Sequence, residues 1–289
     1  MKVCVTSYSF NKLLKKGEYN QLTAMQKAKE IGFDAMEFSG ILPHDGSSME
    51  EYAKMLRREA DKIDFPIVSL VISADLINGY EGRTIDEEIA HVKRMVDIAE
   101  ILGVKTMRHD VLYSLGAYKS FDALLPTLAE RVTEIAEYAK TKGIKTCVEN
   151  HGRICQDPDR VERLFNAVKS DNFGILCDMG NFLCVDAEPQ KAVSLVAPYT
   201  VFVHAKDFYL KPGNTDSPGK GYSVTRGGNY IKGTIAGHGI VPVKQCLGIL
   251  KRAGYDGYVS LEFEGMEENI EALTIGLANL RRYIKELEA

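Results

Sequence analysis

The feature that most constrains the fold of this chain is an alternation of short apolar runs with longer amphipathic runs, which repeats along the sequence. Short apolar runs are typical of buried parallel strands, and parallel strands need a helical crossover between them. The predicted strands are Val3–Phe10, Ala35–Ser39, Ile67–Ala74, Thr106–Val111, Lys145–His151, Phe173–Met179, Thr200–Asp207 and Tyr258–Glu264.

Helical spacing follows each of these strands, and glycine ends several of the helices, as helix C-termini favour. Eight strand–helix units predict an α/β fold, a single (β/α)₈ TIM barrel, which typically needs ~250 residues. The 289 residues suffice for one such domain over positions 1–289, and a doubly wound open sheet is the alternative. The predicted helices are Asn20–Ile31, Glu50–Ile63, Asp86–Leu102, Phe121–Lys142, Pro158–Val168, Gln190–Val196, Val243–Ala253 and Asn269–Leu287.

One connection is much longer than the others. Residues Phe208–Val241 separate the seventh strand from its helix and hold eight of the 25 glycines. We expect a long glycine-rich loop without regular structure, because loops of this length in compact domains are usually functional or mobile. In a barrel, positions 208–241 would form a rim loop or lid at the C-terminal ends of the strands, where active sites lie. A disordered insertion is the alternative.

Composition excludes several classes of protein. The chain is 45% hydrophobic and 26% charged with a formal net charge of −4, which excludes intrinsic disorder and disfavours a nucleic-acid partner. It has no apolar run of 18 residues and no signal-peptide pattern, so we expect no membrane association and a cytoplasmic location. The six cysteines form no CxxC pair, which predicts reduced, buried thiols rather than a zinc site.

Strand alternation predicts which side chains face the barrel interior, because successive side chains point to opposite faces. In the last strand, Val259 and Leu261 belong to the apolar face that must meet the helices, so Glu262 points inward. The same reasoning turns one acidic or imidazole side chain inward at the end of each of the three preceding strands: Glu149, Asp178 and His204.

These four side chains predict a metal site. Carboxylates that converge in a confined space raise one another's pKa unless a cation neutralises them. Three carboxylates with one imidazole suit a borderline-hard divalent cation. We expect Mn²⁺ at this position, with Mg²⁺, Co²⁺ and Zn²⁺ left open.

Four motifs at these positions resemble the sugar phosphate isomerase/epimerase family, the xylose isomerase-like TIM-barrel superfamily. They are Val-Glu-Asn-His (148–151), Cys-Asp-Met-Gly-Asn (177–181), Val-His-Ala-Lys-Asp (203–207) and Leu-Glu-Phe-Glu-Gly (261–265). The resemblance extends over essentially the whole chain. It implies that Glu149, Asp178, His204 and Glu262 are the metal ligands. It also implies that Glu149 and Glu262 flank the substrate carbon chain as catalytic residues.

The resemblance implies a chemistry in which a metal polarises a carbonyl while a base takes the neighbouring proton. We therefore expect an isomerase or epimerase that acts on a small keto-sugar, polyol-derived or cyclitol substrate through an enediolate. The alternative is a dehydratase or lyase that uses the same enolate with His151 as base. Asn181 and Leu210 stand where tagatose-type 3-epimerases carry His and Arg, which disfavours a simple ketose 3-epimerase.

Further residues are predicted to contact a small carbohydrate substrate. The phase of the fourth strand leaves two choices, Arg108 with Asp110 or His109 alone, and we expect His109 to face inward. No phosphate-binding loop pattern occurs, so an unphosphorylated substrate is favoured. A non-catalytic sugar-binding barrel, a homo-oligomer and a partner subunit stay open. The predicted substrate-binding residues are Glu37, His109, Asn181, Lys206 and Arg226.

Overall fold

Parallel strands close into a barrel in the computed structural model, which describes residues 1–288. The order around the barrel is β1-β11-β7-β6-β5-β4-β3-β2. The expected (β/α)₈ barrel is therefore confirmed, and the open-sheet alternative is excluded. The barrel strands are β1 (Lys2–Thr6), β2 (Ala35–Ser39), β3 (Ile67–Ile72), β4 (Thr106–His109), β5 (Lys145–Glu149), β6 (Phe173–Asp178), β7 (Thr200–Ala205) and β11 (Tyr258–Leu261).

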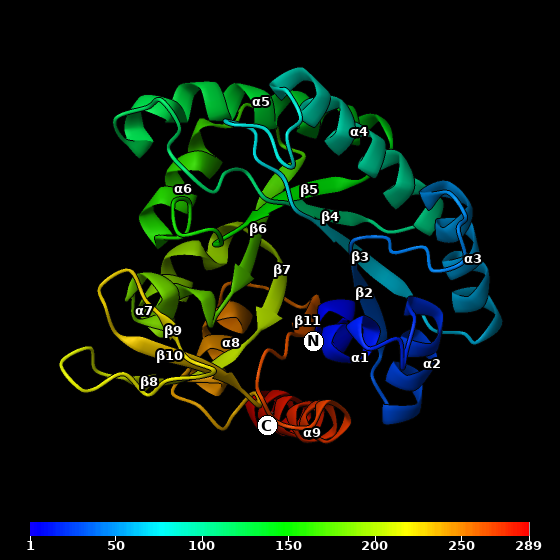
Figure 1. The fold of residues 1–289 in the computed structure, drawn as a ribbon, viewed down its shortest axis with the longest axis vertical. Coiled ribbons are helices and arrows are strands. Elements are labelled where there is room, and N and C mark those ends of the chain that lie inside the picture. The colour runs from blue at the N-terminus through cyan, green and yellow to red at the C-terminus, as the bar shows by residue number, and fades with distance from the viewer. Residues whose placement is uncertain (289) are drawn as a thin grey trace.

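Helices cover the outside of this barrel, as Figure 1 shows. Ser48 and Thr84 begin two of them with capping boxes, in which each side chain exchanges hydrogen bonds with a glutamate three residues later. Within residues 1–288, no helix is both long and apolar enough to cross a membrane. The α-helices are α1 (Asn11–Lys15), α2 (Gln21–Ile31), α3 (Met49–Lys62), α4 (Ile85–Leu102), α5 (Phe121–Thr141), α6 (Pro158–Ala167), α7 (Pro189–Val196), α8 (Val243–Arg252) and α9 (Asn269–Glu288).

The barrel interior contains a small apolar cluster that is separate from the larger core between strands and helices. Side chains from alternate positions of the strands fill it, and each is at most 3% exposed. This cluster closes the inside of the barrel below the polar residues described in the next section. Its buried members are Cys4, Ala35, Cys147, Leu176 and Phe202.

Several predicted strands end earlier than expected. The predicted strand Val3–Phe10 stops at Thr6, and Ser7–Phe10 form the 3₁₀ helix η1. The predicted strand Thr200–Asp207 divides, because β7 ends at Ala205 and β8 (Asp207–Lys211) starts a second sheet. Two further 3₁₀ helices, η2 (Asn181–Val185) and η3 (Ala197–Tyr199), flank α7.

The connection over 208–241 is folded, so the expectation of a loop without regular structure is wrong. Antiparallel strands β8, β10 (Tyr230–Thr234) and β9 (Ser223–Val224) form a sheet, which Figure 1 shows projecting from one side of the barrel. The carboxylate of Asp207 accepts hydrogen bonds from the backbone of Gly237, Gly239 and Val241, at 2.8–3.0 Å. The glycine content obscured these strands, which alternate weakly and are short.

Candidate metal centre

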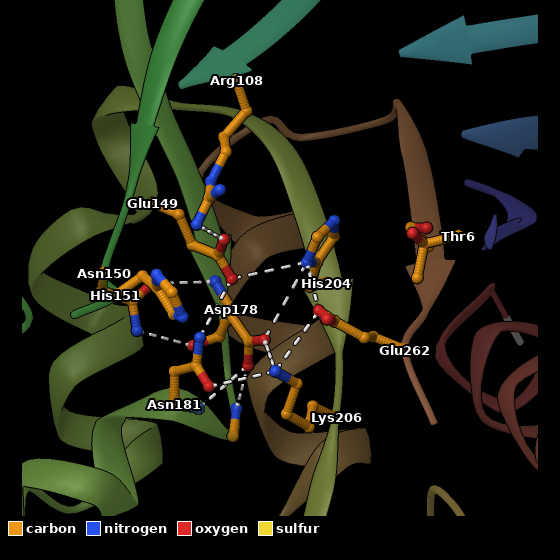
Figure 2. A network of polar contacts seen from close by, with 12 residues as sticks. Thr6, Arg108, Glu149, Asn150, His151, Asp178, Asn181, His204, Lys206 and Glu262 are labelled. Carbon is orange, nitrogen blue, oxygen red and sulfur yellow. Dashed lines mark hydrogen bonds and ion pairs between the residues drawn. The ribbon is translucent and has the colours of Figure 1, made fainter. Parts of the chain in front are cut away.

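The four side chains predicted to bind a metal lie together at the C-terminal end of the barrel. Glu149, Asp178 and His204 extend from β5, β6 and β7, and Glu262 follows β11 directly. One ligand atom from each lies within 4.8 Å of every other, and Figure 2 shows them facing a common space. The parallel strands bring Glu149 and Glu262, which are 113 positions apart, to one edge of the barrel.

The donor atoms of this cluster fit a bound cation. His204 Nδ1 lies 2.7 Å from Glu262 Oε2, 3.5 Å from Glu149 Oε1 and 3.9 Å from Asp178 Oδ2. Among the described residues, Asp178 Oδ2, His204 Nδ1 and Glu262 Oε2 are buried atoms without a hydrogen-bond partner. Buried polar atoms are rarely left unpartnered, and these three converge. A divalent cation would satisfy all of them, so the cluster suits a metal site.

Burial and charge set the pKa values inside the cluster. Burial is the largest influence on Asp178 and raises its pKa to about 7, although Lys206 opposes this. Burial also disfavours charge on Glu262, but Lys206 and His204 outweigh it and hold the pKa of Glu262 at about 2. For His204, burial lowers the pKa, whereas Glu37 and Glu262 raise it well above its ordinary value. In the absence of a cation, these carboxylates therefore favour the protonated imidazole.

Arg108, on β4, forms an ion pair with one of the candidate ligands. Its guanidinium lies 2.5 Å from Glu149 Oε2 and 2.6 Å from Asp110 Oδ1, and both carboxylates are buried. Burial disfavours the ionised form of Glu149, but Arg108 outweighs it and holds the pKa of Glu149 well below its usual range. Asn181 Nδ2 also donates to Glu149 Oε1 at 3.0 Å. Glu149 is thus a fixed carboxylate.

The inward orientation predicted for His109 is wrong. Arg108 pairs in register with Cys147, a member of the interior apolar cluster, so Arg108 and Asp110 take the inner face. His109 is fully buried, and its Nδ1 contacts the carbonyl oxygen of Asp110. On that face it cannot reach a substrate inside the barrel. Polar side chains stand on both faces of this strand, Arg108 on one and His109 on the other, which is why alternation alone did not decide the phase.

His151 lies next to Asp110 at the edge of the cluster. Its Nδ1 is 2.9 Å from Asp110 Oδ1, and 39% of its side chain is exposed. Burial lowers the pKa of His151, but Asp110 outweighs it and the pKa is raised. The hydroxyl of Tyr113 donates to the other oxygen of Asp110. Sequence reasoning missed Asp110 as the partner of His151 and Tyr113 as a second partner of Asp110. The Arg-His-Asp run at 108–110 was the available signal for Asp110.

Lys206 adds a buried positive charge beside the candidate ligands. Its Nζ lies 3.4 Å from both Asp178 Oδ2 and Glu262 Oε2, and it donates to Glu264 Oε1 at 2.9 Å. Burial lowers the pKa of Lys206, but these carboxylates raise it well above its ordinary value. Lys206 also donates to Asn181 Oδ1 at 3.2 Å, which links the ammonium to the support of Glu149.

Two other predicted substrate contacts lie elsewhere. Glu37 is completely buried and accepts a 2.7 Å hydrogen bond from His204 Nε2, so the prediction that it contacts substrate is wrong. Glu37 does face the barrel interior, but it lies below His204 and not at the rim. Arg226 forms an ion pair with Asp157, with 2.7 Å between its Nη1 and the carboxylate. This pair ties the segment after β9 to the residues that precede α6.

The comparison with known proteins decides the family. The model of the Xylose isomerase-like TIM barrel family matches residues 25–283. The chain belongs to this family. It is 24% identical over 271 residues to the inosose dehydratase of Histophilus somni, an alignment that covers 89% of this chain and 86% of the relative.

Solved structures with the same fold include two with informative names. The apo form of 3-keto-D-glucoside 4-epimerase from E. coli is 16% identical with a TM-score of 0.70, over 98% of this chain and 99% of that one. IOLI protein with a bound zinc atom is 17% identical with a TM-score of 0.73, over 99% and 98%. Relatives in this enzyme family are thus named as dehydratases and as epimerases.

Proposed function

We propose that this chain is a divalent-metal-dependent dehydratase that removes water from a small polyhydroxylated ketone. The observation that carries the proposal is how the titratable side chains around the cluster are paired, because these pairs determine which of them can accept and donate a proton. Inversion at a carbon requires two carriers on opposite faces of the substrate, whereas elimination of water can proceed with one carrier that first accepts and then donates a proton.

Glu149 and Glu262 are poor proton carriers in this arrangement. Arg108 holds Glu149 as a carboxylate, and the pKa of Glu262 is about 2. Lys206 has the opposite property, since its raised pKa keeps it as an ammonium. An efficient carrier needs a pKa near the working pH, and none of these three has one. The scheme in which the two glutamates exchange protons on opposite faces is therefore disfavoured.

His151 has the properties of a single carrier. Its ordinary pKa is near 6.5, and the adjacent Asp110 raises it. Because Nδ1 faces Asp110, Nε2 is the nitrogen that is free to work. Asp110 also stabilises the imidazolium that forms when Nε2 accepts a proton.

The reaction assigned to these residues is a balanced elimination. The cation supplies Lewis-acid polarisation of the substrate carbonyl. His151 Nε2 accepts the proton from the carbon beside the carbonyl, and the electron pair of that C–H bond becomes the new C=C bond. The hydroxyl on the next carbon leaves, takes the proton back from His151 and departs as water. Lys206 provides a fixed positive charge for the oxygens of the substrate, and His151 returns to its neutral form.

The similarity to inosose dehydratase of Histophilus somni supports a cyclic keto-polyol as substrate. Mn²⁺ is the cation we propose, because oxygen ligands outnumber the single imidazole nitrogen. The alternative is an epimerase of the same substrate class. It is the activity named for a protein of the same fold, 3-keto-D-glucoside 4-epimerase from E. coli.

Mass spectrometry in D₂O distinguishes these reactions. The Mn²⁺-loaded protein is incubated with an inosose, and the mixture is analysed over time. We expect a product lighter than the substrate by one water. If the sugar instead keeps all its oxygens and gains one deuterium, without loss of water, the result would support the epimerase and contradict the dehydratase.

A further inference from the structure

Glu37 lies below the metal centre and contacts one of its members from behind. His204 Nε2 donates to Glu37 Oε2 at 2.7 Å, and Ser260 Oγ donates to the same oxygen at 3.0 Å. Glu37 and Ser260 are both fully buried, so water does not reach this contact. Glu37 therefore acts on the site only through His204.

Stability alone does not explain a carboxylate at position 37. It lies two residues above Ala35, on the strand that contributes to the interior apolar cluster. Within the described residues, its second oxygen, Oε1, is buried and has no hydrogen-bond partner. Burying a carboxylate with an unpartnered oxygen costs free energy, and an apolar side chain in such a place is often neutral or stabilising.

The hydrogen bond to Glu37 determines how His204 faces the cluster. A proton on Nε2 leaves the lone pair of Nδ1 available in the neutral ring, and Nδ1 is the atom near Glu149, Asp178 and Glu262. A carboxylate behind a histidine ligand fixes the tautomer and ring orientation and increases the ligand's basicity.

We propose that Glu37 is a positioning residue that sets the cation affinity of the centre through His204. This inference rests on the proposed metal-dependent function and deepens it. The carboxylate holds Nε2–H, aims Nδ1 at the cation and contributes a negative charge that the neutral amide of glutamine would lack.

The test is the affinity of the purified full-length chain for Mn²⁺, measured by competition with a chelating dye. Glu37→Gln keeps the size of the side chain and removes its charge. Removing such a partner typically weakens metal binding by about 10–100-fold, and we expect a loss in that range. The Co²⁺-loaded variant should also show a changed visible absorption spectrum, because a different His204 environment alters the ligand field.

Glu88→Gln is the matched control. Glu88, on α4, is likewise a fully buried carboxylate, but its partners are Arg83 and the backbone of Asp75, away from the cluster. We expect its Mn²⁺ affinity and Co²⁺ spectrum to match the wild type. If Glu37→Gln does not fold, Glu37→Leu replaces it, since an apolar side chain suits the interior, and the same loss is expected.

The outcomes separate the two proposals. Wild-type Mn²⁺ affinity in a folded Glu37 variant, or an equal loss in Glu88→Gln, would overturn the role of Glu37 and leave the metal-dependent function standing. A wild-type chain that binds no Mn²⁺ would contradict the metal-dependent function itself.

Discussion

The inside of the barrel has two layers of opposite character, separated by two residues along the same strands. The lower layer is apolar and nearly inaccessible, whereas the upper layer is charged and contains unpartnered atoms. Because side chains alternate, a step of two residues keeps the same inward direction while the chemistry changes completely. On β5, β6 and β7 the pairs, lower then upper, are Cys147 and Glu149, Leu176 and Asp178, and Phe202 and His204.

Folding and chemistry are therefore separable within one barrel. The lower layer excludes water and supports the strands, and the upper layer concentrates charge where the strands end. Substitutions in the upper layer should therefore change metal binding and activity, whereas substitutions in the lower layer should change stability.

The largest effect is expected from removing two charges of the upper layer. The double substitution Glu149→Gln and Glu262→Gln should abolish stoichiometric Mn²⁺ binding and lower activity by about 1000-fold or more, since Lewis-acid stabilisation contributes several kcal/mol. Elemental analysis after dialysis measures the bound metal. Retention of one equivalent of Mn²⁺ in the folded variant would refute these ligands.

Replacing the proton carrier should separate chemistry from metal binding within the upper layer. His151→Asn should lower kcat by about 100–10,000-fold, because it removes general acid–base catalysis. Mn²⁺ affinity should stay close to that of the wild type, because His151 contacts Asp110 rather than the candidate cation site. Kinetics and metal titration of the same preparation provide the check, and unchanged kcat would exclude His151 as the carrier.

A lower-layer substitution should have the opposite signature. Leu176→Ala empties part of a fully buried site and should reduce the free energy of unfolding by about 2–5 kcal/mol. Leu195→Ala, at a position 37% exposed, is the control and should change it by at most about 0.5 kcal/mol. Chemical denaturation of the metal-free proteins measures both. A Leu176→Ala protein as stable as the wild type would contradict the division of roles between the two layers.

Metal binding in the upper layer should strengthen as pH rises. The pKa of His204 is raised in the metal-free protein, so its proton is present below that pKa and must leave before Nδ1 can bind a cation. Each proton released corresponds to about a tenfold gain in Mn²⁺ affinity per pH unit. Calorimetry in two buffers of different ionisation enthalpy counts the protons. Affinity independent of pH between 6 and about 8 would contradict this assignment.

The smallest effect is expected at the rim, outside both layers. Arg226→Ala breaks an ion pair with Asp157 in which 42% of the arginine side chain is exposed. Such exposed pairs contribute about 0–1 kcal/mol, so thermal unfolding should shift little. A large loss of stability would show that the sheet of β8, β9 and β10 supports the barrel.

The sequence alone was sufficient to predict the barrel and the four-residue cluster, because both depend on periodic patterns along short stretches of chain. Apolar alternation in the last strand determined the direction of Glu262, and the same rule brought Glu149 and His204 to one place. Alternation failed at β4, where it did not distinguish Arg108 from His109.

Contacts between distant segments could not be predicted in this way. The pair of Glu37 and His204 joins residues 167 positions apart, and its depth in the barrel depends on how far each strand extends. The ion pair of Arg108 with Glu149 has the same origin, as it needs the register between β4 and β5. The sheet within 208–241 escaped notice because its strands are short and glycine-rich connections separate them.

The upper layer of the barrel is proposed to bind one divalent cation. Anomalous diffraction at the manganese edge, from crystals grown with Mn²⁺, tests this binding most directly. We expect one strong anomalous peak within coordination distance of His204 Nδ1 and of the carboxylates of Glu149, Asp178 and Glu262. Absence of a peak there in crystals whose solution contains Mn²⁺, or a peak only at another site, would contradict it.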